Sequence, residues 1–350
     1  MNRVGVLATT ALTTATALVI STFAAADTAL LVTTASTGPD ATSTTAVAAT
    51  MPPVATDYVV TDDRGVEVDI ASAERLIPLD GDIAEIIFAL GLGDLVVATD
   101  LSATYPPEAD ALPQIGYQRA LSAEPIIDFE PTLLLATDVA GPPETLTDLE
   151  AVGIPLVMIP TSPDATGAAD KIVAVAEAVG VPERGATLAA EVQAQIDAAV
   201  ERRDETGEPL RIVTIYLRGA DTQVVLGEDY STHWLIEAAG AIDVATELGI
   251  TESVSVTGEA LIRAAPDVLL VTEDGLASVG GRDGLLEAIP ALARTPAGET
   301  GAILAYDAQL MLGNGPRTGE FLDTLIDDLA MIADGGSAAS GSAATTSEPS

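Results

Sequence analysis

Residues 124–137 read Glu-Pro-Ile-Ile-Asp-Phe-Glu-Pro-Thr-Leu-Leu-Leu-Ala-Thr, and residues 259–272 read Glu-Ala-Leu-Ile-Arg-Ala-Ala-Pro-Asp-Val-Leu-Leu-Val-Thr. Both stretches place a proline seven residues after the glutamate and a threonine six residues after that proline. Arg75-Leu-Ile-Pro-Leu is likewise echoed 136 residues later by Arg211-Ile-Val-Thr-Ile. Nearly equal offsets indicate that the chain contains two similar lobes. Two lobes imply a cleft between them in which a ligand would bind.

Short apolar runs alternate with helical patterns in each half of the chain. In the first half, strands are expected at 75–79, 95–98, 133–136 and 156–159, with helices at 83–90 and 144–151. In the second half, strands are expected at 211–216, 223–226, 268–272 and 302–306. Strands that alternate with helices predict an α/β fold with a mostly parallel sheet.

The middle of the chain has a continuous helical pattern. Residues 166–179 form one apolar-periodic stretch, which Gly180 closes. Pro182 opens a second stretch that continues to Arg203 and would form a helix about 30 Å long. We therefore predict two similar α/β lobes joined by a single long helix, with the ligand cleft between them. Such a helix would hold the lobes nearly rigid.

The two ends of the chain differ in composition from the rest. Arg3, the apolar stretch 4–23 and the small residues at 24–26 are typical of an export signal, although about 20 such residues could also stay as an uncleaved anchor. The predicted organisation is a signal peptide at 1–26, a flexible Thr/Ala/Pro-rich tether at 27–57, an N-terminal lobe at 58–165, a helical linker at 166–206, a C-terminal lobe at 207–334 and a disordered tail at 335–350. The folded part is therefore expected outside the cytoplasm.

The charge composition excludes several kinds of partner and site. The chain has 53 acidic and 14 basic residues, a formal net charge of -39, and a single lysine, Lys171. A field of this sign repels nucleic acid and anionic membranes, and it favours solubility in high salt. The absence of cysteine excludes thiolate sites, and His233 as the only histidine excludes a multi-histidine metal site. No nucleophile elbow, P-loop or dinucleotide fingerprint occurs, so we do not expect an enzyme.

Four further motifs carry a resemblance to a known family. They are Gly-Tyr-Gln-Arg-Ala-Leu-Ser-Ala-Glu at 116–124, Ala-Gly-Pro-Pro at 140–143, Gly-Gly-Arg-Asp-Gly-Leu-Leu at 280–286 and Leu-Gly-Asn-Gly-Pro-Arg-Thr at 312–318. Residues 70–335 resemble the helical-backbone substrate-binding proteins of ABC importers, and the first motif is similar to the signature of their haem-binding branch. The resemblance implies capture of haem and its delivery to an ABC permease. The chain departs from that pattern at Pro125, where glycine is usual, and in having no cysteine for lipid attachment.

Each half also carries one Tyr-x-Arg element, Tyr117 with Arg119 and Tyr216 with Arg218. A phenolate oxygen is a known axial ligand of haem iron and suits the ferric state. Free tyrosine has a pKa of about 10, so an arginine two residues later would help by stabilising the phenolate. We predict that Tyr117 and Tyr216 are the iron ligands. They would either face each other around one ferric haem or each face a separate haem.

The haem propionates and the family suggest further candidates. Propionate contacts are predicted for Arg119, Arg218 and Arg317, because arginine binds carboxylates in a bidentate way. Arg282 is a weaker candidate. His233 begins a helical pattern, where it would either be a structural residue beside a Ser/Thr cap or, as the resemblance implies, lie next to the porphyrin.

Glu124 and Glu259 occupy equivalent positions in the two repeats, each at the expected first turn of a helix. Stabilisation by the helix dipole is a local explanation, contributing about 0.3–1 kcal/mol. The resemblance implies instead that each glutamate docks onto arginines of the membrane permease. The predicted partners are therefore haem and an ABC permease, without nucleic acid, and the protein itself is expected to be a monomer.

Cobalamin and ferric siderophores are alternative ligands, because members of the same family bind them. A siderophore would need a basic pocket rather than a phenolate, and a corrinoid would need an aromatic-lined pocket. Aromatic residues make up only 3% of the chain, which argues against the corrinoid. The motif at 116–124 favours haem over both.

Overall fold

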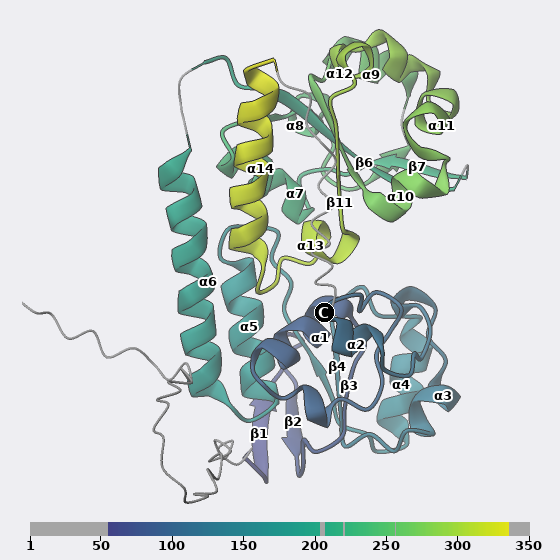
Figure 1. The fold of residues 1–350 in the computed structure, drawn as a ribbon. Helices are drawn as coiled ribbons and strands as arrows, with labels where there is room; N and C mark the ends of the chain where they lie inside the picture. Colours follow the sequence, from purple (N-terminus) through teal and green to yellow (C-terminus); the bar gives the residue numbers. More distant parts are fainter. Residues whose placement is uncertain (1–54, 204–206, 220, 256, 336–350) are drawn as a thin grey trace, which may run out of the picture. The chain divides into compact units, whose positions relative to one another are not determined.

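The structure contains two main β-sheets, one from each half of the chain, with helices around them (Figure 1). This computed structural model describes residues 55–335 except 204–206, 220 and 256. The predicted signal peptide, most of the predicted tether and all but the first residue of the predicted tail lie outside the described residues. Within the described part, no helix is both long and apolar enough to cross a membrane.

The first sheet has three parallel strands in the order β3-β4-β5. They span Leu76–Pro78, Leu133–Ala136 and Leu156–Met158. Every residue of β3 and β4 is buried, as expected for uninterrupted apolar runs in a parallel sheet covered on both faces. The surrounding elements are β1 (Tyr58–Thr61), β2 (Glu67–Ile70), α1 (Gly81–Ala89), α2 (Pro107–Asp110), α3 (Ala123–Ile127), α4 (Pro143–Ala151) and the 3₁₀ turns η1 (Gly93–Leu95) and η2 (Gln118–Ala120).

The second sheet has the strand order β11-β10-β6-β7-β9, and β8 also pairs with β6. The pairs β8–β6, β6–β10 and β10–β11 are parallel, whereas β7 pairs antiparallel with both β6 and β9 and so begins an antiparallel edge. Their bounds are Arg211–Arg218 (β6), Thr222–Val225 (β7), Ile242–Asp243 (β8), Val254–Ser255 (β9), Val268–Thr272 (β10) and Ile303–Tyr306 (β11). The helices are α7 (Ser231–Ala238), α8 (Val244–Leu248), α9 (Gly258–Ala264), α10 (Glu273–Ser278), α11 (Gly281–Ala288), α12 (Pro296–Thr300) and α13 (Ala308–Leu312), with a 3₁₀ turn η3 at Pro290–Arg294.

The repeat seen in the sequence corresponds to the same structural unit in both sheets. In each copy a short helix, α3 or α9, leads into a buried strand, β4 or β10. An arginine at the start of the neighbouring strand, just before β3 or as the first residue of β6, contacts the end of that helix or the residues just after it. Arg75 donates to the carbonyl oxygens of Phe129 and Glu130, just beyond α3, and Arg211 donates to the carbonyl oxygen of Ala264 in α9. The two arginines therefore satisfy carbonyl groups at equivalent helix ends.

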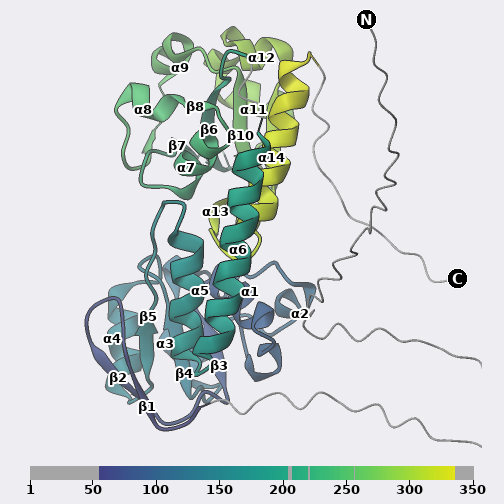
Figure 2. The same ribbon diagram turned by 90° about the vertical axis from the view of Figure 1, so that its left-hand side faces the viewer.

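Three long helices lie together beside the sheets: α5 (Gly167–Ala178), α6 (Pro182–Arg202) and α14 (Thr318–Ala333). Helix α6 packs against both α5 and α14, as Figure 1 and Figure 2 show. It has 21 residues, which corresponds to about 32 Å. The predicted long helix is therefore present, and the predicted α/β fold class is confirmed. The boundaries proposed for the two lobes stay predictions.

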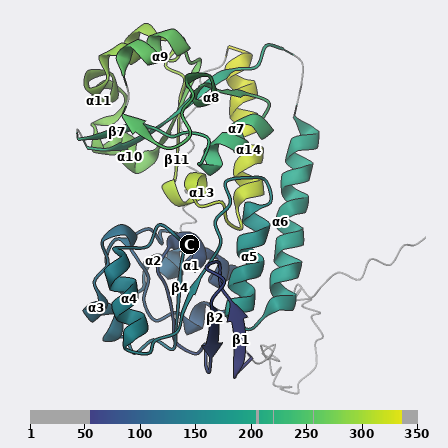
Figure 3. The ribbon, with the colours of Figure 1, turned by 180° about the vertical axis from the view of Figure 1, so that it is seen from behind.

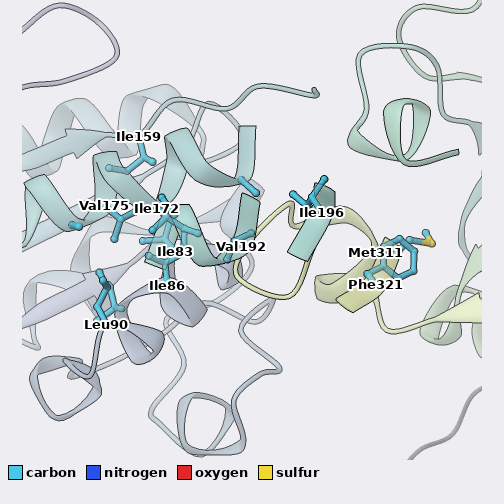
Figure 4. Close-up of a cluster of buried hydrophobic side chains, with 14 of the residues drawn as sticks. Ile83, Ile86, Leu90, Ile159, Ile172, Val175, Val192, Ile196, Met311 and Phe321 are labelled. Carbon is cyan, nitrogen blue, oxygen red and sulfur yellow. The ribbon is translucent and has the colours of Figure 1, made fainter. Parts of the chain in front are cut away.

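One apolar core extends from the first sheet through these helices to the second sheet. Figure 4 shows part of it, with Ile83 and Ile86 of α1, Val192 and Ile196 of α6, and Phe321 of α14. All of these side chains are buried. Helix α6 therefore contributes its apolar face to the packing of both halves of the chain.

The expected strand at 95–98 is wrong. Leu95 belongs to the turn η1, and only Val96 forms a bridge with Leu76. The run is apolar, but η1 leaves it too short to form a ladder before the buried turn at Asp100. Hydrophobicity alone does not show where a chain stops pairing.

Candidate functional site

Tyr117 lies at a turn that two of the sequence motifs build together. Gly116 has a φ of 109°, and its carbonyl accepts a hydrogen bond from the Leu101 N–H at 2.9 Å. After Tyr117 the chain enters η2, where the Gln118 carbonyl accepts from the Gly141 N–H at 2.8 Å. The motifs at 116–124 and 140–143 are thus joined by backbone hydrogen bonds. Tyr117 is half-buried at this turn, directly before η2.

Tyr216 lies near the carboxyl end of the central strand β6, where it pairs with Val224 of β7. It is half-buried, and Arg218, two residues later, is exposed. Gly219 follows with a φ of 63°, a conformation that favours glycine, and its N–H donates to Ser278 Oγ at 2.9 Å. The turn after Arg218 is therefore fixed against the end of α10.

The structure brings the two Tyr-x-Arg elements together. Arg218 Cζ lies 4.4 Å from the centroid of the Tyr117 ring. The Tyr117 and Tyr216 phenols also lie close enough for Tyr117 to raise the pKa of Tyr216. The two tyrosines predicted as iron ligands therefore meet from opposite halves of the chain. The arginine contact is crossed, because Arg218 lies over the tyrosine of the other element, while Arg119 is exposed.

The pKa of Tyr216 differs from the sequence expectation. Burial raises the pKa of the Tyr216 phenol, and the neighbouring Tyr117 and Asp274 raise it further. The Arg218 guanidinium opposes these effects without overcoming them. The phenol therefore keeps its proton at neutral pH, and a bound cation would have to displace that proton. Arginine at this spacing does not by itself produce a lowered pKa.

Arg317, predicted to bind a propionate, already has a carboxylate partner. Its Nε and an Nη each donate to a Glu85 oxygen at 2.8 Å. Its Cζ also lies 3.7 Å from the centroid of the Tyr105 ring. The structure thus places this guanidinium against α1 and the Tyr105 ring. Arg282, the weaker candidate, is exposed on α11.

His233 lies in the first turn of α7, and the structure does not place it with the tyrosines. Its Nδ1 is 3.1 Å from Asp243 Oδ2, and Asp243 is buried in β8. Asp243 pairs with Ile212, four residues before Tyr216 on β6, which corresponds to about 13 Å along the strand. The expected Ser/Thr cap is also absent, since Tyr230 is the N-cap residue and no side-chain bond caps the helix. The observed contacts therefore favour the structural role.

Glu124 and Glu259 occupy the positions expected from the repeat. Each is exposed and lies in the first turn of its helix, α3 or α9. Among the described residues, no group of three His, Cys, Asp or Glu side chains could hold a metal ion.

Comparison with known proteins places the chain in a family. Residues 76–310 match the family model of the periplasmic binding proteins. The chain belongs to that family. The description of the family, periplasmic binding protein, agrees with the predicted location of this chain outside the cytoplasm.

Solved structures of this family are similar over most of their length. The periplasmic haem-binding protein RhuT from Roseiflexus sp. RS-1, in apo form, is 49% identical with a TM-score of 0.71, over 73% of this chain and 97% of RhuT. The periplasmic haem-binding protein BhuT, in complex with two haems, is 35% identical with a TM-score of 0.65, over 72% of this chain and 96% of BhuT. These matches confirm the predicted two-lobed class.

A curated relative carries a different ligand in its name. The vitamin B12-binding protein of Vibrio campbellii is 32% identical over 130 residues, which are 37% of this chain and 47% of that relative. This chain thus spans about half the length of that protein. The match extends the similarity to a protein named for binding vitamin B12.

Proposed function

We propose that this protein captures ferric haem outside the cytoplasm and delivers it to an ABC importer. The observation that carries the proposal is the meeting of Tyr117 and Tyr216 from opposite halves of the chain, with Arg218 over the Tyr117 ring. Phenolate oxygen suits ferric iron, and an adjacent guanidinium stabilises the phenolate. The similarity to RhuT and BhuT supports the same ligand.

The two tyrosines would ligate the iron, and the nearby arginines would serve the rest of the haem. Arg218 and Arg119 are both exposed, so either guanidinium can reach a propionate. Arg317 and His233 already contact Glu85 and Asp243, so they stay secondary candidates. One haem clamped by both tyrosines requires them to separate, because the two phenols are neighbours in this structure. Two haems, as in the BhuT complex, would give each tyrosine its own iron.

Delivery to the importer would use the exposed glutamates Glu124 and Glu259. They lie at equivalent helix starts in the two repeats, so a permease with two symmetric basic patches could contact both. Charges at these positions would set orientation and encounter rate. The docked protein is expected to be a monomer.

Cobalamin is the second candidate ligand, favoured by the relative from Vibrio campbellii. Equilibrium titration of the purified protein with hemin, cyanocobalamin and a ferric siderophore separates the candidates. We expect saturable binding of hemin with a shift of the Soret band, and weaker or no binding of the other two ligands. Saturable binding of cyanocobalamin without binding of hemin would reject the haem proposal and leave the family assignment unchanged.

A further inference from the structure

A buried polar network joins the start of α1 to α13 and the segment after it, and neither the tyrosines nor the comparisons account for it. Gln309 of α13 is at its centre and is 8% exposed. Its Nε2, with two N–H donors, has three acceptors within hydrogen-bond distance: the carbonyl of Gly81 at 2.8 Å, and Glu85 Oε2 and the carbonyl of Tyr105 at 3.0 Å each. Its Oε1 accepts from the N–H groups of Thr104 and Tyr105 at 2.8 and 2.9 Å. One side chain from the second half of the chain thus satisfies several polar groups of the first half.

Two cations reinforce this contact. Arg317 forms the bidentate pair with Glu85, and Glu85 is 4% exposed. Lys171 of α5, the only lysine of the chain, donates to Asp82 of α1 and to the carbonyl of Gly313 at 2.7 Å. Lys171 is also 4% exposed. Both cations therefore bridge α1 to residues that follow α13.

These contacts differ from ordinary surface ion pairs. Charged groups buried this deeply are costly unless they are paired and hydrogen-bonded, so the partners cannot separate without leaving an unpaired charge. The network links segments more than 220 residues apart, such as Glu85 and Arg317. Figure 1 and Figure 3 both show α13 next to α1. Separation of the two halves at this point would break the network.

We propose that Asp82, Glu85, Lys171, Gln309 and Arg317 form an interlobe latch that sets the spacing between Tyr117 and Tyr216. The latch fixes the start of α1 against the second half of the chain, and the tyrosines are carried by the two halves that it joins. Its residues are positioning residues, because their hydrogen bonds and ion pairs go to partners other than Tyr117 and Tyr216. The effect on ligand binding rests on the proposed haem function, whereas the effect on spacing does not.

The spacing is measurable because the chain has no cysteine of its own. Asp148→Cys on α4 and Glu287→Cys on α11 place one exposed label site in each half. Pulsed electron spin resonance on the spin-labelled protein without hemin should give one narrow distance distribution. Adding Gln309→Ala or Glu85→Gln should broaden or shift that distribution. An unchanged distribution in both variants would overturn the latch.

A matched control separates the latch from general loss of stability. Tyr306 donates a buried hydrogen bond to Asp328 of α14 at 2.5 Å, within the second half of the chain, so Tyr306→Phe should destabilise the protein without altering the distance. If Gln309→Ala does not fold, Glu85→Gln carries the test, because it keeps the shape and an acceptor for Arg317. With hemin, Glu85→Gln should speed dissociation at least tenfold while the absorption spectrum at saturation stays that of the parent. A broadened distance without any hemin binding by the parent would uphold the latch and reject the haem function.

Discussion

Removal of the Arg218 guanidinium tests the crossed contact between the two Tyr-x-Arg elements. In the variant Arg218→Gln, Tyr117 loses a cation whose Cζ lies 4.4 Å from its ring centroid. Two unit charges near that separation interact with about 1 kcal/mol in bulk water and about 4 kcal/mol at an effective dielectric constant of 20. Because Arg218 is exposed, the lower value applies. A loss of about 1 kcal/mol weakens hemin binding roughly fivefold at neutral pH.

The assay is a hemin titration followed by absorbance in the parent protein, Arg218→Gln and Arg119→Gln. Loss of about 1 kcal/mol should weaken hemin binding roughly fivefold and shift the ferric-phenolate band in Arg218→Gln, and should leave both unchanged in Arg119→Gln. The opposite pattern would refute the crossed contact and restore support within each element. Weaker binding with an unchanged ferric-phenolate band would assign Arg218 to a propionate instead.

Three further predictions concern stability and delivery. Burial raises the pKa of Asp100 from 3.8 to about 6, so the folded state holds this proton more tightly than the unfolded state. The free energy of unfolding should therefore fall as pH rises from about 4 to 6. Urea denaturation across this pH range should show that Asp100→Asn removes about 3 kcal/mol of the fall. Lys171→Met leaves Asp82 buried without its cation and should destabilise the protein by about 3–5 kcal/mol, most of which a second change, Asp82→Leu, should restore; a single variant as stable as the parent would contradict the burial of this pair. Reversing Glu124 and Glu259 to arginine should abolish haem uptake by cells while hemin affinity stays within about twofold, and normal uptake would rule out docking at these residues.

Most of the fold could be predicted because its strands are short, apolar and almost fully buried. Strand β4 at Leu133–Ala136 was predicted with the same bounds, since a parallel strand covered on both faces gives an uninterrupted apolar run. The long helix α6 was predicted within one residue at its end, because its apolar positions keep a helical period over 21 residues. The sequence repeat also corresponds to a structural repeat, since each copy has a short helix, a buried strand and an arginine that contacts the end of the helix or the residues just after it.

The contacts between the halves could not be predicted from spacing along the chain. Tyr216 and Arg218 lie on the same face of β6, which is why the sequence suggested that they support each other. The arginine side chain instead reaches the tyrosine of the other half, at a distance set by how the lobes meet. Asp82 and Glu85 of α1 are also buried, next to the segment around α13, whose residues are more than 220 positions later in the chain. The one signal available was Lys171, a single lysine within an apolar helical pattern.

The most direct measurement is the absorption spectrum of the hemin complex in the parent protein and in the Tyr117→Phe, Tyr216→Phe double variant. Both substitutions remove only a hydroxyl group, so the fold should be kept, and circular dichroism provides the control. If the tyrosines ligate the iron, the parent shows a ferric-phenolate charge-transfer band that the double variant lacks, with hemin binding weakened by more than tenfold. An identical spectrum and affinity in the two proteins would contradict ligation by Tyr117 and Tyr216.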